Sequence, residues 1–240
     1  MFVKALPSML TVGNLFLGIV AIVFAFQDLV DLAAITVIIG MLLDGLDGRV
    51  ARMFNVQSEF GKELDSLSDV ISFGVAPAFI MYVVALQGLE MIGIIITAIF
   101  PICGALRLAR FNVQAGVPGY FIGLPITAAG GVLATLALFH EVFHIAVLSL
   151  GMLLLAFLMV SKVKYPNFKK VGIPKAAYWI TPLIVALVVI IAVKFPSQFP
   201  KLVFLPLALY ALYGIKKNVD LLLKKLRKEK SQEKETVPFD

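Results

Sequence analysis

The sequence predicts an all-α polytopic membrane protein with about eight transmembrane helices. Three observations support this fold class. Hydrophobic residues make up 60% of the 240 residues, and the mean hydropathy is +0.98, which is far above the value for a soluble domain. The chain contains apolar segments of about 20 residues, the length that crosses a bilayer. Finally, the basic residues are distributed unevenly between the connections that join these segments.

The apolar segments are expected to form the transmembrane helices. They lie near residues 9–27, 30–53, 64–86, 89–110, 122–140, 142–161, 176–194 and 200–216. The breaks at Gln27 to Leu29 and at Gln87 to Gly88 are short, so we expect tight hairpins there. We expect residues 1–8 to form a separate amphipathic segment on the membrane surface. The first apolar stretch lacks a strongly basic start, so it is expected to remain as a span and not to be cleaved as a signal peptide.

The positions of the basic residues predict the orientation. If the N-terminus is cytoplasmic, all of the 21 lysines and arginines except Lys194 and Lys201 fall on the cytoplasmic side, as the positive-inside rule requires. We therefore predict a multi-pass protein of the cell membrane with both termini inside. Residues 1–216 would form the membrane domain and residues 217–240 a basic cytoplasmic tail. Because topology explains the net charge of +6, we do not expect a nucleic-acid partner.

Residues 44–69 place charged side chains inside this membrane sequence. An ionised group among transmembrane helices costs about 2.5 to 3.5 kcal/mol on insertion scales, so such groups usually mark a functional site. If both flanking segments are helical, Asp65 and Asp69 lie on one face of the second helix. One face of the first helix, at positions i, i+3, i+4, i+7 and i+8, carries Asp44, Asp47, Gly48, Ala51 and Arg52.

Packing these two helices together would bring four carboxylates into one small volume. Their mutual repulsion favours a bound cation. Oxygen ligands without a nearby His or Cys suit Mg²⁺, Mn²⁺ or Ca²⁺ better than zinc. The sequence therefore predicts a divalent metal site, and the topology puts it at the cytoplasmic face. The single cysteine, Cys103, lies in an apolar run and is expected to be a buried apolar side chain.

The same stretch resembles the CDP-alcohol phosphotransferases, whose pattern D-x₂-D-G-x₂-A-R-x₈-G-x₃-D-x₃-D it matches without a gap. The matching residues are Asp44, Asp47, Gly48, Ala51, Arg52, Gly61, Asp65 and Asp69. The segments LPSMLTVGNLFLGIVAI, SDVISFGVAPA, GALRLARFN and FIGLPITAAGG look like the phosphatidylserine synthase branch of that family. The likeness covers most of residues 5–131. One departure is Ser8, where the family pattern has asparagine.

The resemblance implies an activity and a set of roles. A member of this branch would transfer the phosphatidyl group of CDP-diacylglycerol, or of a CDP-archaeol-type ether lipid, to the hydroxyl of L-serine and release CMP. The resemblance also implies a homodimer. It implies two divalent cations, Mg²⁺ or Mn²⁺ with Ca²⁺ as an alternative bound ion, and Asp69 would act both as a ligand and as the general base. The metal ligands would be Asp44, Asp47, Asp65 and Asp69.

The resemblance also points to residues that would contact the substrates. We expect the serine pocket around Arg107 and Arg110. These arginines could equally be interfacial residues that only reach toward the headgroups. The residues expected to contact the CDP-lipid are Gly48, Ala51, Arg52, Ser58, Gly61, Ser8 and Thr11. Thr11 and the nearby Asn14 have the alternative role of hydrogen bonding to neighbouring helices.

Two other functions remain open from the sequence. A sister enzyme would use glycerol 3-phosphate or inositol phosphate as the acceptor, and such a phosphate would call for basic residues like Arg107 and Arg110. A cation-coupled transporter would use the acids as an ion site. The transporter gives no reason for the spacing of Gly48, Arg52 and Gly61, and we therefore favour the enzyme.

Overall fold

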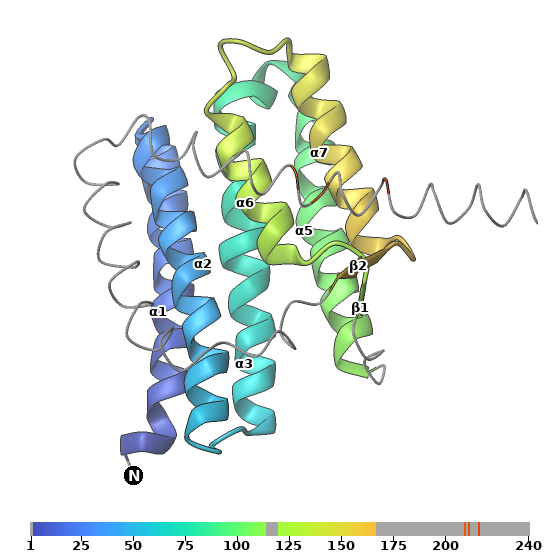
Figure 1. Ribbon diagram of the computed structural model, residues 1–240. Helices are drawn as coiled ribbons and strands as arrows, with labels where there is room; N and C mark the ends of the chain where they lie inside the picture. The colour runs from blue at the N-terminus through green and yellow to red at the C-terminus, as the bar shows by residue number, and fades with distance from the viewer. Residues whose placement is uncertain (1, 114–119, 167–208, 210, 212–215, 217–240) are drawn as a thin grey trace, which may run out of the picture.

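The computed structural model describes residues 2–113 and 120–166, together with positions 209, 211 and 216. These residues form a bundle of helices with one short strand pair (Figure 1). The α-helices of this part are α1 (Phe2–Phe26), α2 (Val30–Met53), α3 (Glu59–Asp69), α4 (Ala76–Met81), α5 (Glu90–Val113), α6 (Ile126–Ala137) and α7 (Ile145–Val160). The bundle agrees with the all-α class expected from the sequence.

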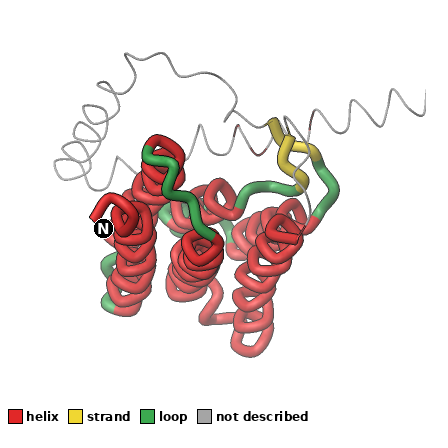
Figure 2. The backbone as a smooth tube through the Cα atoms, turned by 90° about the horizontal axis from the view of Figure 1, so that it is seen from below, coloured by secondary structure: helices red, strands yellow, loops and turns green. Residues whose placement is uncertain are grey.

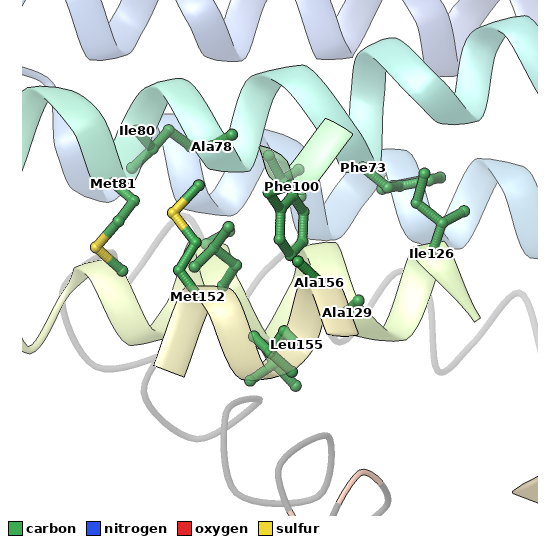
Figure 3. Packing of buried hydrophobic residues seen from close by; sticks show 14 of the residues in the cluster. Phe73, Ala78, Ile80, Met81, Phe100, Ile126, Ala129, Met152, Leu155 and Ala156 are labelled. Atoms are coloured by element: carbon green, nitrogen blue, oxygen red, sulfur yellow. The ribbon is translucent and has the colours of Figure 1, made fainter. Parts of the chain in front are cut away.

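The centre of the bundle is one long rod made of α3, α4 and two π-helical segments, Val70–Val75 and Tyr82–Leu86. The rod contacts α1, α5 and α6, and the view along the bundle shows helices on several sides of it (Figure 2). Phe73 and Met81 of the rod are fully buried. They gather with Phe100 of α5 and Met152 of α7 in the apolar core (Figure 3).

Small residues allow the closest helix contacts. A side-chain carbon at Gly18 of α1 would lie 2.5 Å from the Ser72 hydroxyl oxygen, and one at Gly130 of α6 would collide with the backbone of Phe73. Small residues at such crossings are typical of helices packed in an apolar environment, because they let two backbones approach. The rod is thereby fixed between α1 and α6, which sets the position of the acids on α3.

Two helical stretches of the described residues are long and apolar enough to cross a membrane. They are Ala5–Phe26, with a mean hydropathy of 2.3, and Glu59–Val113, with 2.2. The apolar helices α6 and α7 are shorter. Each of the first six expected segments overlaps a helix. Segment 176–194, most of segment 200–216 and the basic tail lie outside the described residues, so the number of spans and the 216/217 domain boundary stay predictions.

The structure corrects two local expectations. Residues 2–8 are not a separate surface helix, because they continue into α1 with Pro7 inside it. Proline fixes φ at about −65°, a value that a helix accepts. The expected helix at 122–140 begins only at Ile126. Before it, β1 (Tyr120–Ile122) pairs antiparallel with β2 (Lys164–Pro166), and Gly123 turns the chain with φ +80°.

Candidate metal centre

The four aspartates of residues 44–69 lie where three helices meet. Hydrogen bonds join Ser68 to Thr11 and Ser72 to Asn14, so α1 and α3 run in the same direction, while α2 runs back between their ends. The start of α1, the end of α2 and the start of α3 therefore share one end of the bundle, marked N in Figure 1. Asp44 and Asp47 lie near the end of α2, and Asp65 and Asp69 lie on α3.

Three of the acids form a compact group of oxygen ligands. One carboxylate oxygen each from Asp44, Asp47 and Asp65 lies within 4.8 Å of the other two. Asp47 is buried, whereas Asp44 and Asp65 are partly exposed. The helical spacing in the sequence put each pair of aspartates on one helix face, and the contacts of α1 with both α2 and α3 bring these faces together.

Asp69 joins this group from the next turn of α3. It is buried, and its neighbours include Asp44, Asp65 and Arg107. Its Oδ1 atom is buried and has no hydrogen-bond partner among the described residues. Buried oxygens normally have a partner, and close carboxylates repel one another unless a cation intervenes. The donor set therefore fits a hard divalent cation such as Mg²⁺ or Mn²⁺.

Hydroxyl groups connect the acids to α1. The Thr11 hydroxyl lies 2.7 Å from Asp47 Oδ2 and 3.1 Å from the Pro7 carbonyl oxygen. The Ser68 hydroxyl donates to the Thr11 carbonyl oxygen at 3.1 Å. The family resemblance implied that Thr11 contacts the CDP-lipid. In the structure its hydroxyl is hydrogen-bonded to Asp47, a candidate metal ligand. Ser68 begins the segment SDVISFGVAPA, but it was not among the residues expected at the site.

The last turns of α2 carry an open helix face. Within the described residues, the nearest group to a side-chain carbon at Gly48 would be the Arg52 guanidinium, at 3.4 Å. Arg52 itself is exposed, and Ala51 is half-buried. This face adjoins the acids, because Gly48 directly follows Asp47. Gly48, Ala51 and Arg52 thus leave space beside the carboxylates for a ligand to approach the helix.

Ser58 and Gly61 form the start of α3. The Ser58 hydroxyl caps the helix by accepting a hydrogen bond from the Gly61 amide at 3.0 Å, as serine commonly does at this position. A side-chain carbon at Gly61 would lie 3.1 Å from that hydroxyl oxygen. These contacts give both residues a structural role that the sequence comparison did not predict. Ser8, on α1, is half-buried.

Arg107 and Arg110 have different surroundings. Arg107 is buried, lies 5.5 Å from the centre of the Phe111 ring, and interacts with Asp69. Arg110 reaches the end of α7. Its guanidinium donates to four backbone carbonyl oxygens, those of Val160, Met159, Ser161 and Ile122. The structure therefore brings Arg107 to the metal-centre candidate and uses Arg110 to connect α5, α7 and β1.

A family model for CDP-alcohol phosphatidyltransferases matches residues 4–160. The chain belongs to this family. The match includes every acid of the candidate centre and both arginines. The CDP-alcohol phosphatidyltransferase family uses divalent metals, in agreement with the acidic cluster formed here by Asp44, Asp47 and Asp65.

Several relatives in this family are similar along most of their length. A CDP-diacylglycerol–serine O-phosphatidyltransferase of Helicobacter pylori is 39% identical over 227 residues, which cover 91% of this chain and 92% of the relative. One of Bacillus subtilis is 41% identical over 165 residues, covering 69% and 92%. An archaetidylserine synthase of Methanothermobacter thermautotrophicus is 38% identical over 173 residues, covering 70% and 72%.

A polar cluster next to Asp65 joins α3 to α5. Lys62 Nζ donates to the Asn112 carbonyl oxygen at 3.4 Å, and Asn112 Nδ2 donates to the Ser66 hydroxyl at 2.9 Å. Ser66 directly follows Asp65, so the cluster fixes the end of α5 against the acidic part of α3. Ser66 was not among the residues expected at the site, and the hydrogen bonds that link α3 to α5 were not expected either.

Proposed function

We propose that this protein is a CDP-diacylglycerol–serine O-phosphatidyltransferase. It transfers the phosphatidyl group of CDP-diacylglycerol, or of an ether-lipid analogue, to the hydroxyl of L-serine and forms phosphatidylserine and CMP. One observation carries the proposal. Asp44, Asp47 and Asp65 converge within 4.8 Å beside the buried Asp69, at the positions that the family pattern requires. The names of the most similar relatives supply the choice of serine as the acceptor.

The proposed reaction is an in-line displacement at phosphorus. The serine hydroxyl oxygen forms a bond to the phosphorus that carries the lipid, and the bond from this phosphorus to the oxygen of CMP breaks. Asp69 accepts the hydroxyl proton, a role that needs proximity and a carboxylate. CMP leaves with the bonding electrons, so no Ser, Cys or His nucleophile is required. The interaction of Asp69 with Arg107 would keep this base beside a positive charge.

The acids would hold the metal ions that the family uses. In our proposal Asp44, Asp47 and Asp65 bind one divalent cation, and Asp44, Asp65 and Asp69 bind a second. Such a pair, Mg²⁺ or Mn²⁺ in the cell, neutralises the diphosphate and stabilises the leaving group in two-metal displacements. The buried Asp69 Oδ1, which lacks a hydrogen-bond partner among the described residues, supports the second position.

The open face of α2 would receive the nucleotide. Gly48 and Ala51 would let the cytidine approach the helix, and the exposed Arg52 would pair with the diphosphate. Ser8, Ser58 and Gly61 remain candidates for further contacts, although Ser58 and Gly61 already cap α3. The support for this assignment is the absence of any neighbour around Gly48 closer than the Arg52 guanidinium, within the described part of the chain.

Serine would bind between Asp69 and α5. Arg107 is the better candidate for its carboxylate, because it is buried beside Asp69. The donors of Arg110 are engaged with backbone carbonyls, which weakens the case for a sister enzyme whose acceptor carries a phosphate. The archaetidylserine synthase among the relatives keeps both acyl and ether lipids as candidate substrates.

We also propose a cellular location and a membrane topology. The long apolar stretches Ala5–Phe26 and Glu59–Val113 favour a multi-pass protein of the cell membrane with its active site and both termini in the cytoplasm. Serine and CMP are soluble, whereas the lipid tails must remain in the bilayer, so a site at the membrane surface meets both needs. By analogy with the family, we also propose a homodimer, which the molecular mass in nanodiscs would test.

An acceptor panel tests the proposed function. The purified protein in liposomes with CDP-diacylglycerol and Mn²⁺ should release CMP with L-serine and much less with glycerol 3-phosphate or inositol phosphate. Release with glycerol 3-phosphate but not with serine would contradict the serine assignment. No release with any alcohol, with either an acyl or an ether CDP-lipid, would contradict the enzyme assignment.

A further inference from the structure

Thr11 of α1 is hydrogen-bonded to both helices that carry the acids. We propose that Thr11 and Ser68 are positioning residues that fix the distance between the α2 and α3 carboxylates. This inference rests on the proposed metal centre and deepens it. It also gives Thr11 a role other than the nucleotide contact expected from the sequence.

The contacts form a continuous chain across three helices. Ser68 of α3 donates to the carbonyl oxygen of Thr11 at 3.1 Å, and the Thr11 hydroxyl lies 2.7 Å from Asp47 Oδ2 on α2. All three residues are buried, with exposed fractions of 0% for Ser68, 3% for Thr11 and 6% for Asp47. Ser68 also directly precedes Asp69. One residue of α1 thus connects Asp47 to the backbone that holds Asp69.

The direction of the Thr11 hydrogen bond follows from charge. The hydroxyl has one proton and two acceptors in reach, Asp47 Oδ2 at 2.7 Å and the Pro7 carbonyl oxygen at 3.1 Å. A bond to an ionised carboxylate is shorter and stronger than one to a neutral carbonyl, so the proton points to Asp47. This bond engages Oδ2 and restrains the orientation of the Asp47 carboxylate.

Close packing at Gly18 places the rod beside α1, but it does not orient a particular carboxylate. Helices in lipid associate through such packing and through interhelical hydrogen bonds, and the bonds of Thr11 and Ser68 are contacts of the second kind. Residues that orient metal ligands through hydrogen bonds typically change metal affinity or activity by about 10-fold to 100-fold when they are removed. Thr135 provides a contrast, because its buried hydroxyl bonds, among the described residues, to Gly131 and Val132 of its own helix α6.

The test measures Mn²⁺ binding to the full-length protein in detergent without any substrate, by the loss of the electron paramagnetic resonance signal of free Mn²⁺. Thr11→Val keeps the side-chain shape but removes the hydroxyl, and it should weaken Mn²⁺ binding about 10-fold or more. Thr11→Ser restores the hydroxyl and should recover most of the affinity. Ser68→Ala should weaken binding several-fold, even if Thr11→Val does not fold. Thr135→Val, the matched control, should bind as the wild type does.

The outcomes separate the two proposals. If the wild type binds no Mn²⁺, the metal centre itself is wrong, and the positioning role is wrong with it. If the wild type binds Mn²⁺ and both folded variants, Thr11→Val and Ser68→Ala, bind it equally well, only the positioning role is overturned. An equal loss in Thr135→Val would also overturn it, because the effect would then come from any buried hydroxyl.

Discussion

The Arg110 guanidinium donates a 2.9 Å hydrogen bond to the carbonyl oxygen of Val160, at the end of α7. Further bonds reach the carbonyl oxygens of Met159 and Ser161. Cations near a helix C-terminus satisfy carbonyl groups that have no partner within the helix. Arg110 is therefore a connection between α5 and α7, whereas Arg107 belongs to the surroundings of Asp69.

We predict that Arg110→Gln chiefly lowers stability. The variant loses charged hydrogen bonds to a helix end, and each such bond contributes about 1.5 to 3 kcal/mol. Thermal unfolding in detergent should show a clearly lower Tm than for Arg49→Gln, a change at an exposed position of α2. An unchanged Tm together with a raised KM for serine would instead assign Arg110 to the acceptor pocket.

Arg107→Gln should affect catalysis instead. Its charge lies beside Asp69, so its removal should lower kcat/KM for serine by roughly 10-fold or more, the loss expected for a charged hydrogen bond. Steady-state CMP release at varied serine concentrations measures this effect. Equal kcat/KM values for the variant and the wild type would exclude Arg107 from the acceptor site.

Gly48→Ala tests the nucleotide face. Alanine stabilises a helix relative to glycine by about 1 kcal/mol, so a loss of activity would not come from a weaker α2. We expect a raised KM for the CDP-lipid with little change in Tm. Gly45→Ala is the matched control, because a side-chain carbon there would meet no atom of the described residues within 4 Å. If both variants keep the wild-type KM, the cytidine does not pack on Gly48.

Asp69→Asn tests the proposed base. Asparagine has nearly the same shape but cannot take the serine proton, and general-base catalysis contributes roughly 10²-fold to 10⁴-fold. CMP release should fall by at least that range, while binding of the CDP-lipid, measured with a non-reacting analogue, should remain largely intact. Full activity in this variant would show that another group accepts the proton.

The sequence predicted the parts of the site that depend on local spacing. Asp44 and Asp47 are about one helical turn apart, as are Asp65 and Asp69. If each segment is helical, each pair therefore lies on one face of its helix. The same spacing put Gly48 on the face that carries Asp44 and Asp47. These features need only the geometry of a single helix and the assumption that the two helices pack together.

The sequence could not predict contacts between residues that are far apart in the chain. The bonds from Thr11 to Asp47 and from Arg110 to Val160 depend on how whole helices cross. A threonine or an arginine in an apolar helix has many available partners, and periodicity does not choose among them. The strand pair of Phe121 and Tyr165 was missed for the same reason, since three-residue strands leave no clear pattern.

The central claim is metal-dependent transfer from a CDP-lipid to serine at the Asp44 to Asp69 site. The most direct test follows CMP and lipid product together in liposomes with CDP-diacylglycerol and L-serine, before and after EDTA treatment. We predict equal amounts of CMP and phosphatidylserine, complete loss of both with EDTA, and recovery with Mg²⁺ or Mn²⁺. Product formation that is indifferent to EDTA, or CMP release without a serine-containing lipid, would contradict the account.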